Sequence, residues 1–154
     1  METLGIDVSG YNGVIDWKKV KSAGYDFAIL KIIRKDLAID KGFERNYLAA
    51  EVAGVQVQGV YNYSYATGLD KAKKDAKAVI KALNGRKTMV WLDVEDNCQK
   101  GLGIILINII NTYQEEIEKA GLEFGLYTGE SFYNSYLKKY KDKLHCPLWI
   151  ARYG

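Results

Sequence analysis

The sequence predicts an α/β fold in which a parallel sheet is covered by helices and curls toward a (β/α) barrel. Two observations indicate this class: six short apolar runs alternate with five segments of helical period, and the runs alternate aliphatic side chains with polar or aromatic ones. Hydrophobic strands that alternate with helices are typical of a parallel sheet. An open doubly wound sheet is the competing architecture, but helices cover both of its faces. The polar face therefore favours a barrel with a wide mouth at the carboxyl ends of its strands.

The predicted strands are short runs of aliphatic, β-branched and aromatic residues. In chain order they are Leu4–Val8, Phe27–Ile33, Val57–Tyr63, Met89–Val94, Glu123–Thr128 and Leu148–Arg152. A complete eight-stranded barrel takes about 200 residues or more. Since six strands are found before Gly154, we expect an incomplete barrel.

The predicted helices lie between these strands and show the apolar spacing of a helix that packs on one face. In order they are Trp17–Ala23, Phe43–Ala53, Lys71–Leu83, Gly103–Ala120 and Ser131–Tyr140. Four of them end at a glycine, which suits a left-handed C-terminal cap; these glycines are Gly24, Gly54, Gly85 and Gly121. The lysines of the third helix form a stripe that we interpret as a solvated face.

Composition and charge exclude several classes of protein. The chain has 154 residues, 48% of them hydrophobic and 27% charged, which suits one soluble globular domain. Its net charge of +3 gives no strong field for nucleic acid. The longest apolar stretch, Leu102–Ile110, falls short of the ~20 residues that span a bilayer, so no membrane insertion is expected. The first residues have neither a basic head nor an apolar run, so no secretory signal is expected.

No cofactor is indicated by the sequence. His145 is the one histidine and stands beside Cys146, a spacing that suits no metal site, and the pairing of Cys146 with Cys98 stays open. Gly101 and Gly103 precede a helix, but Leu106 stands where a dinucleotide fingerprint has its third glycine. We therefore expect neither a metal nor a nucleotide.

Three carboxyl groups are the strongest candidates for chemistry. Asp93 and Glu95 stand two residues apart at the end of the fourth strand, which places them on one face with backbones about 6.6 Å apart. Asp7 ends the first strand and is expected to face the same interior. Acids that converge raise one another's pKa, and glycoside hydrolysis needs one carboxyl that keeps a proton. A helix cap, a surface salt bridge and a magnesium-binding pair are the alternatives.

At these residues the sequence resembles glycoside hydrolase family 25, the Chalaropsis-type lysozymes that include catalytic domains of phage endolysins. Six segments match in order along nearly the whole chain. A single segment would be weak evidence for the family, but six in the same order are specific to it. They are Gly5–Ser9 with Trp17, Phe27–Lys31, Gly59–Ser64, Trp91–Glu95, Gly125–Thr128 and Leu148–Tyr153.

The resemblance implies an N-acetylmuramidase that cuts the β-1,4 bond between N-acetylmuramic acid and N-acetylglucosamine in bacterial peptidoglycan. It makes Glu95 the general acid. Asp93 would assist the acetamido group or an oxocarbenium-like centre, and Asp7 would position the site. The residues that match the family's substrate-binding positions are Tyr61, Tyr63, Tyr127, Trp149 and, more weakly, Lys31. Packing in the barrel core is the alternative role for the aromatic ones.

The resemblance also implies a flattened, TIM-like barrel whose last two strands have no counterpart here. We therefore expect residues 1–154 to form a single catalytic barrel domain, truncated at the C-terminus, with its sheet open between the sixth strand and the first. Exposed strand edges attract partners, so a second chain could supply the missing strands. A lone monomer is expected to be poorly stable and weakly active.

Three functions stay open from the sequence. The leading one is a muramidase acting at the bacterial cell wall, either released from the cytoplasm with the help of a holin or exported by a leader absent from this chain. A carbohydrate-binding pseudoenzyme, or one part of a split lysin, would keep the aromatic cleft without competent chemistry. A barrel glycosidase acting on chitin shares the acidic motifs.

Overall fold

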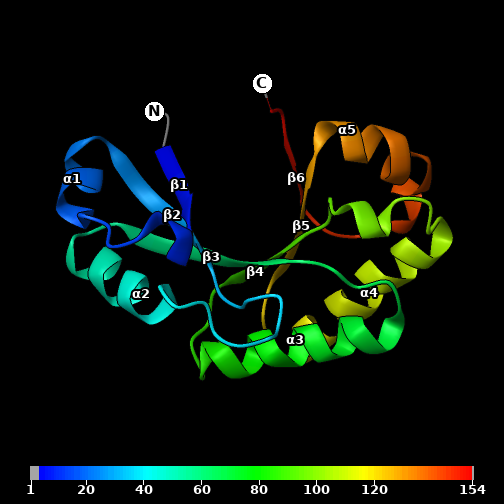
Figure 1. Ribbon diagram of the computed structural model, residues 1–154, viewed down its shortest axis with the longest axis horizontal. Coiled ribbons are helices and arrows are strands. Elements are labelled where there is room, and N and C mark those ends of the chain that lie inside the picture. Colours follow the sequence, from blue (N-terminus) through cyan, green and yellow to red (C-terminus); the bar gives the residue numbers. More distant parts are fainter. Residues whose placement is uncertain (1–3, 154) are drawn as a thin grey trace.

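The strands of the sheet follow one another in space as they do along the chain. In the computed structural model, which describes residues 4–153, every neighbouring pair of strands is parallel. The strands are β1 (Leu4–Val8), β2 (Tyr25–Lys31), β3 (Gln56–Tyr63), β4 (Met89–Asp93), β5 (Phe124–Gly129) and β6 (Leu148–Ala151). The sheet curls into a half-barrel with β1 and β6 at its two edges (Figure 1). The predicted α/β class and the open side between the sixth strand and the first are confirmed for the described residues.

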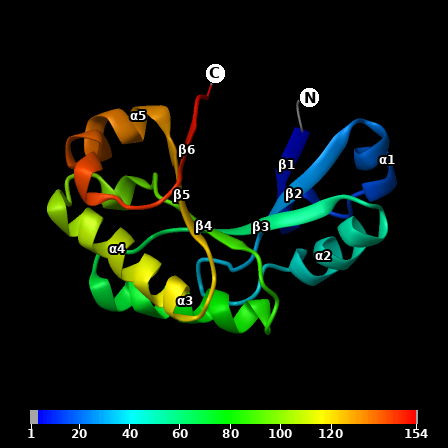
Figure 2. The same cartoon turned by 180° about the vertical axis from the view of Figure 1, so that it is seen from behind.

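Helices cover the convex side of the curled sheet, as the views from both sides show (Figures 1 and 2). They are α1 (Trp17–Ser22), α2 (Phe43–Val52), α3 (Leu69–Leu83), α4 (Ile104–Lys119) and α5 (Glu130–Phe132). Short 3-10 segments at Gly10–Asn12 and Asn97–Gln99 follow β1 and β4. No helix among residues 4–153 has the length and apolar character needed to cross a bilayer.

The helix ends follow from the local sequence. Asp16 caps α1, its side chain accepting a hydrogen bond from the amide of Lys19 at 3.2 Å. After the helices the backbone turns through left-handed glycines, as predicted; their φ angles are 96° at Gly24, 82° at Gly54, 85° at Gly85 and 79° at Gly121. These turns return the chain directly to the next strand.

The hydrophobic core lies between the sheet and the helices. Aliphatic side chains of the convex sheet face are buried there, among them Leu30, Val60, Val90, Leu92 and Leu126. The small and apolar face of α3 packs inward, whereas its lysine stripe is exposed, as expected. The burial removes aliphatic surface from water and leaves the other sheet face free for polar and aromatic groups.

The concave face of the sheet is built from large rings that lie against glycines. A Cβ atom on Gly5 would collide with the ring of Phe27 on the neighbouring strand. Trp91 of β4 lies between Gly59 of β3 and Gly125 of β5, and a side chain at Gly125 would collide with its indole. The glycines therefore make room for the rings that line the hollow.

Two predicted elements differ from the structure. The second strand ends at Lys31 and not at Ile33, because the apolar run continues into a loop in which Ile32 and Ile33 are buried and Ile33 forms a bridge with Ile39. The fifth predicted helix consists of α5 followed by a π-helical turn, Tyr133–Leu137, and a 3-10 segment, Lys138–Lys143. Its aromatic, Asn and Ser residues are weak helix formers, which is consistent with this irregularity.

Candidate active site

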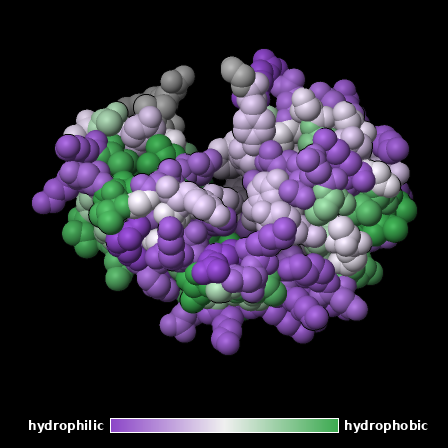
Figure 3. Space-filling model, viewed as in Figure 1, coloured by the Kyte–Doolittle hydropathy of each residue, from purple (hydrophilic) through white to green (hydrophobic). Residues whose placement is uncertain are grey.

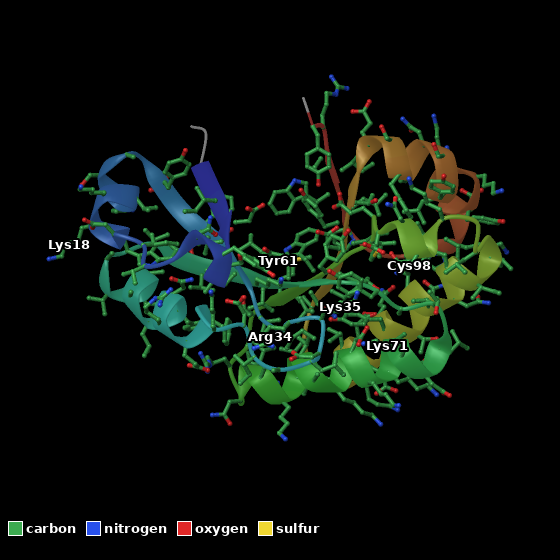
Figure 4. All side chains as sticks on the ribbon, viewed as in Figure 1. Lys18, Arg34, Lys35, Tyr61, Lys71 and Cys98 are labelled. Carbon is green, nitrogen blue, oxygen red and sulfur yellow. The ribbon has the colours of Figure 1, made fainter. Side chains whose placement is uncertain are left out.

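A pocket of about 180 Å³ opens at the carboxyl ends of the strands, on the concave face of the sheet. Its lining comes from β1 to β6: Asp7, Ile29, Tyr61, Trp91, Asp93, Tyr127, Trp149 and Tyr153. The molecular surface is hollowed between the β1 side and the β6 side (Figure 3). Tyr61 lies near the middle of the curled sheet (Figure 4). The topology thus gathers side chains that are far apart in sequence into one sugar-sized hollow.

Asp93 is the buried carboxyl of this pocket, with 7% of its surface exposed. Burial is the main reason that its pKa lies far above the usual range, and the hydrogen bond with Glu95 and the charges of Glu95 and Asp7 add to it. Its Oδ1 atom is buried without a hydrogen-bond partner among the described residues. An ionised carboxylate in this position would be costly, so Asp93 keeps a proton that it can share with Glu95.

Glu95, the predicted general acid, does not line this pocket but lines a second hollow beside it. That hollow is lined by Glu95 together with residues of the β5–α5 region, and Tyr153 lines both cavities. The hydroxyl of Tyr153 donates to the Glu95 carboxylate, at 2.9 Å from Oε1 and 3.0 Å from Oε2, and lies 3.2 Å from the hydroxyl of Tyr127. Glu95 is half-buried, and its carboxylate is held by the hydroxyl of Tyr153.

Asp7 enters the pocket from the opposite side, at the end of β1. It is exposed, and its charge contributes to the raised pKa values of both Asp93 and Tyr61. Burial is the larger cause of the shift at Tyr61. The structure thus brings Asp7, Asp93 and Glu95 together across four strands.

Aromatic rings form the β6 side of the pocket. The Trp149 indole packs edge-on against Trp91, with ring centroids 5.5 Å apart, and against Tyr127, with centroids 5.1 Å apart. Such rings offer flat apolar faces beside polar tips, which suits the faces and hydroxyls of a sugar. Tyr61 and Tyr127 present hydroxyls to the same space.

Two of the predicted substrate-binding residues lie outside this pocket. The hydroxyl of Tyr63 donates to Asp96 at 3.1 Å, and its ring packs against Tyr65 with centroids 5.0 Å apart. Lys31 lies in a neighbouring hollow, its ammonium group 5.2 Å from the centre of the Tyr11 ring. Neither side chain lines the pocket that contains Asp7 and Asp93.

Tyr153 and Trp91 line the pocket although neither is among the predicted site residues. The signal for both was present, because side chains two apart on a strand share a face. The prediction of Trp149 therefore implies that Tyr153, four residues later, faces the same side, and the prediction of Asp93 implies the same of Trp91. Asp96, which receives the hydrogen bond from Tyr63, follows Glu95 directly and was hidden in the loop after the strand.

Metal-binding geometry is not found among residues 4–153, where no three Asp, Glu, His or Cys side chains gather as a metal ion would need. Cys98 and Cys146 are free thiols.

Comparisons with known proteins agree with this geometry. The model of the family "Glycosyl hydrolases family 25" matches residues 6–154. The chain is 26% identical over 151 residues to "Probable GH family 25 lysozyme 2" of Dictyostelium discoideum, covering 97% of this chain and 71% of the relative. It is 28% identical over 164 residues to lysozyme M1 of Streptomyces globisporus, covering 97% of this chain and 54% of that protein.

Solved structures show the same fold. The crystal structure of the bacterial lysozyme from Streptomyces coelicolor superposes with a TM-score of 0.81 and 26% identity, covering 100% of this chain and 76% of the other. The chain spans 71% of the Dictyostelium relative but about half of lysozyme M1. Because the family model covers nearly all of the sequence, this chain belongs to glycosyl hydrolases family 25.

Proposed function

We propose that this chain is a peptidoglycan hydrolase that cuts the β-1,4 bond between N-acetylmuramic acid and N-acetylglucosamine. Membership of a glycosyl hydrolase family and similarity to lysozymes support this activity. The observation that carries it is an aromatic pocket lined by Asp7 and the buried Asp93, with Glu95 beside it in the adjoining hollow and bound to Tyr153, which lines both. Burial also raises the pKa of Asp93, which favours its protonated form. Two carboxyls that differ in protonation are what glycoside hydrolysis requires.

Glu95 is proposed as the general acid. It is less buried than Asp93 and is held in place by the Tyr153 hydroxyl. When the glycan binds, the proton shared by the pair passes to the glycosidic oxygen through Glu95 as the bond from that oxygen to C1 breaks. A water molecule then supplies a hydroxyl to C1 and returns its other proton to Glu95.

Asp93 and Asp7 are proposed to act on the sugar that becomes positively charged. Once the shared proton leaves, Asp93 is an ionised carboxylate in a nearly dry site, where its attraction for an oxocarbenium-like carbon is strong. Its unpartnered Oδ1 can instead accept from the N–H of the substrate acetamido group. Asp7 adds negative charge from the β1 side and orients the sugar against Tyr61.

This activity would be exerted at the bacterial cell wall. Two routes to the wall are proposed, release from the cytoplasm with the help of a holin and export by a leader sequence. Neither nucleic acid nor membrane lipid is part of the proposed function.

The test is the release of reducing ends from purified peptidoglycan, with the new end sugar identified by mass spectrometry. Wild type is expected to release muramic acid ends, and Glu95→Gln to lose about 100-fold or more of this rate, the usual contribution of a general acid. Glu123→Gln is the matched control, because Glu123 is exposed and lies outside the pocket. Equal rates for wild type and Glu95→Gln would remove Glu95 from the acid role.

The same assay separates the alternative functions. Wall binding without product release would identify a carbohydrate-binding pseudoenzyme or a part of a split lysin. Equal cleavage of chitin oligomers, which lack the lactyl group of muramic acid, would identify a broader glycosidase.

A further inference from the structure

A second, larger hollow of about 610 Å³ lies at the same edge of the sheet. Loops that follow β1, β2 and β3 form it. We call it the basic hollow, and the side chains that define it are Tyr11, Lys31, Arg34, Lys35, Lys41 and Tyr65. Arg34 and Lys35 stand on the loop after β2, below Tyr61 in the view of Figure 4.

The carboxylates of the basic hollow are already occupied by protein donors. Asp40 is buried and accepts the backbone N–H groups of Gly10 at 2.8 Å and Gly42 at 3.0 Å. Asp36 accepts from Arg34 at 2.7 Å and from the amide of Ala38 at 3.1 Å. These acids therefore stabilise the loop, and the four basic side chains of the hollow outnumber its two carboxylates.

The lysines of the hollow keep their charge, although Lys35 also attracts the Asp96 carboxylate after β4. Among residues 4–153, none of Lys31, Lys35 and Lys41 has a carboxylate within ion-pair distance. The Lys35 ammonium instead lies 4.6 Å from the centre of the Tyr65 ring, and that of Lys31 lies 5.2 Å from the Tyr11 ring. An aromatic face attracts a cation but does not neutralise it, so these charges stay available to a ligand.

The loop that carries these residues has a defined backbone. Ile33 and Ile39 form an antiparallel bridge, and the amide of Arg34 donates to the carbonyl of Ala38 at 2.7 Å. The amide of Asp40 donates to the carbonyl of Ile32 at 2.8 Å. The lysine positions are thus set by a hydrogen-bonded hairpin, which reduces the entropy lost when a ligand binds.

The basic hollow adjoins the pocket lined by Asp7 and Asp93, which we call the acidic pocket. Lys31 pairs in register with Tyr61, which lines the acidic pocket, and the charge of Asp40 acts on that same tyrosine. A ligand that spans both sites would therefore place a neutral sugar over the acids and an anionic group among the lysines. Chitin has no such anionic group, whereas the lactyl group of muramic acid in peptidoglycan carries an amide-linked acidic peptide.

We propose that the basic hollow binds the carboxylates of the peptide attached to muramic acid. It would thereby select peptide-bearing glycan over bare glycan. This inference rests on the proposed muramidase function and adds a specificity site to it. Lys35 and Lys41 are the residues that discriminate, since they belong to the hollow and not to the acidic pocket.

The experiment compares two substrates that share one glycan: intact peptidoglycan and the same strands after an amidase has removed the peptides. The amidase leaves the lactyl carboxylate on each muramic acid, so the two substrates differ in the carboxylates of the peptide and in this one group. For each, kcat/KM is measured with wild type, with Lys35→Ala/Lys41→Ala, and with the control Lys18→Ala/Lys73→Ala. The control removes two exposed lysines on α1 and α3, and Lys18 lies far from Tyr61 in Figure 4. The ratio of kcat/KM for the peptide-bearing over the peptide-free strands is the readout.

We expect Lys35→Ala/Lys41→Ala to lower this ratio by about tenfold, the effect of losing two exposed charge pairs, through a higher KM. The control is expected to keep the wild-type ratio. A ratio that is the same in all three proteins would overturn the proposal. A fall that disappears when wall phosphodiester polymers are stripped, with the peptides left in place, would assign the hollow to phosphate and overturn it as well.

A binding measurement keeps the result independent of catalysis. The free acidic peptide is titrated into 15N-labelled protein, and the amide shifts of residues 31–41 are followed in wild type and in Lys35→Ala/Lys41→Ala. Saturable amide shifts in wild type that are smaller in the variant support the proposal. If such shifts occur but no glycosidic bond is cleaved, the proposed muramidase function fails and the peptide-binding proposal stands. Unchanged shifts in wild type would contradict the proposal.

Discussion

The Asp93 side chain combines two properties that each disfavour an ionised carboxylate. It is buried, and it faces two further carboxyls, Glu95 and Asp7. Both conditions favour its neutral form, and its Oδ1 has no donor among the described residues that would favour the charged one. Ionisation of Asp93 is therefore unfavourable in this site, and the carboxyl keeps the proton that the proposed chemistry needs.

Asp93→Asn should stabilise the fold while it abolishes activity. A carboxyl whose pKa is raised in the folded state keeps its proton there, whereas the unfolded chain loses it above the ordinary pKa near 3.8. Stability of the wild type should therefore fall as the pH rises through that value. Asparagine mimics the neutral carboxyl, so the variant should be more stable at pH 7 by about 1 kcal/mol or more, equivalent to one pKa unit.

Thermal melts of wild type and Asp93→Asn between pH 3 and pH 8 measure this difference. It should shrink at the acidic end, where both states of the wild type bind the proton. An equal melting temperature at neutral pH would mean that Asp93 is ionised at little cost.

Tyr153→Phe tests how Glu95 is held. The variant keeps the ring but removes the hydroxyl that contacts both Glu95 oxygens and the Tyr127 hydroxyl. Since one such hydrogen bond contributes about 1 kcal/mol, kcat on peptidoglycan should fall by several-fold, with little change in melting temperature. Tyr133→Phe is the control, because Tyr133 lines neither hollow around Glu95. If kcat is unchanged in Tyr153→Phe, the tyrosine does not position the acid.

At the residue scale the sequence predicted the acids better than their partners. Strand alternation placed Asp7, Asp93 and Tyr61 on the inner face, which is where they lie. It could not show that Lys31, at the last position of β2, points into a different hollow from Ile29, because the loop that receives it is built from residues up to ten positions further on. Tertiary packing therefore decides which hollow a side chain at the end of a strand enters.

The element that shapes the pocket floor is the β3–β4–β5 triplet. The Trp91 indole lies over Gly59 and Gly125, which stand on its two neighbouring strands. Any side chain at Gly125 must therefore displace the ring or the strand. This packing gives the concave face its depth.

Gly125→Ala should destabilise the protein by about 1–3 kcal/mol, as overpacking of a filled site does. Urea unfolding followed by circular dichroism measures the loss. In a Trp91→Ala background the same substitution should cost far less, because the colliding ring is gone, and the double-mutant cycle isolates that coupling. A Gly125→Ala penalty that is equal in both backgrounds would mean that the indole does not limit this position.

The ends of helices and strands could be predicted where a glycine interrupts the sequence, but not where the residues on both sides of the boundary are alike. Glycines with a left-handed backbone marked the ends of the helices before β2, β3, β4 and β5. Hydrophobicity alone did not end β2, since Ile32 and Ile33 are buried in the loop beyond it. Nor did it reveal the π-helical turn at Tyr133–Leu137, which no spacing in the sequence announces.

On the scale of the whole molecule, the half-barrel presents two unpaired strand edges, β1 and β6, among the described residues. On the β6 side, Leu148 is 40% and Ile150 is 38% exposed. Strand edges of this kind offer backbone hydrogen bonds to another chain. The number of strands predicted this openness, and their alternation predicted the curl of the sheet. The pairing of particular rings with particular glycines could not be predicted from the sequence.

We expect the 154-residue chain to self-associate through these edges as its concentration rises. Ile150→Lys places a charge on β6 and should shift the population toward monomer in size-exclusion chromatography with light scattering. Val52→Lys is the matched control, because Val52 is exposed on α2, away from both edges. A wild-type chain that stays monomeric at every concentration would show that the edges do not recruit a partner.

The central claim is that one carboxyl of the Asp93–Glu95 pair keeps its proton at neutral pH inside the pocket. It is tested most directly by NMR titration of 13C-labelled carboxyl groups, with Asp93→Asn and Glu95→Gln used for assignment. The account predicts that a single carboxyl resonance of the pair remains in its protonated position at pH 7, and that this resonance disappears in Asp93→Asn. Two resonances that both titrate in the ordinary acidic range of aspartate and glutamate, near pH 4, would contradict it.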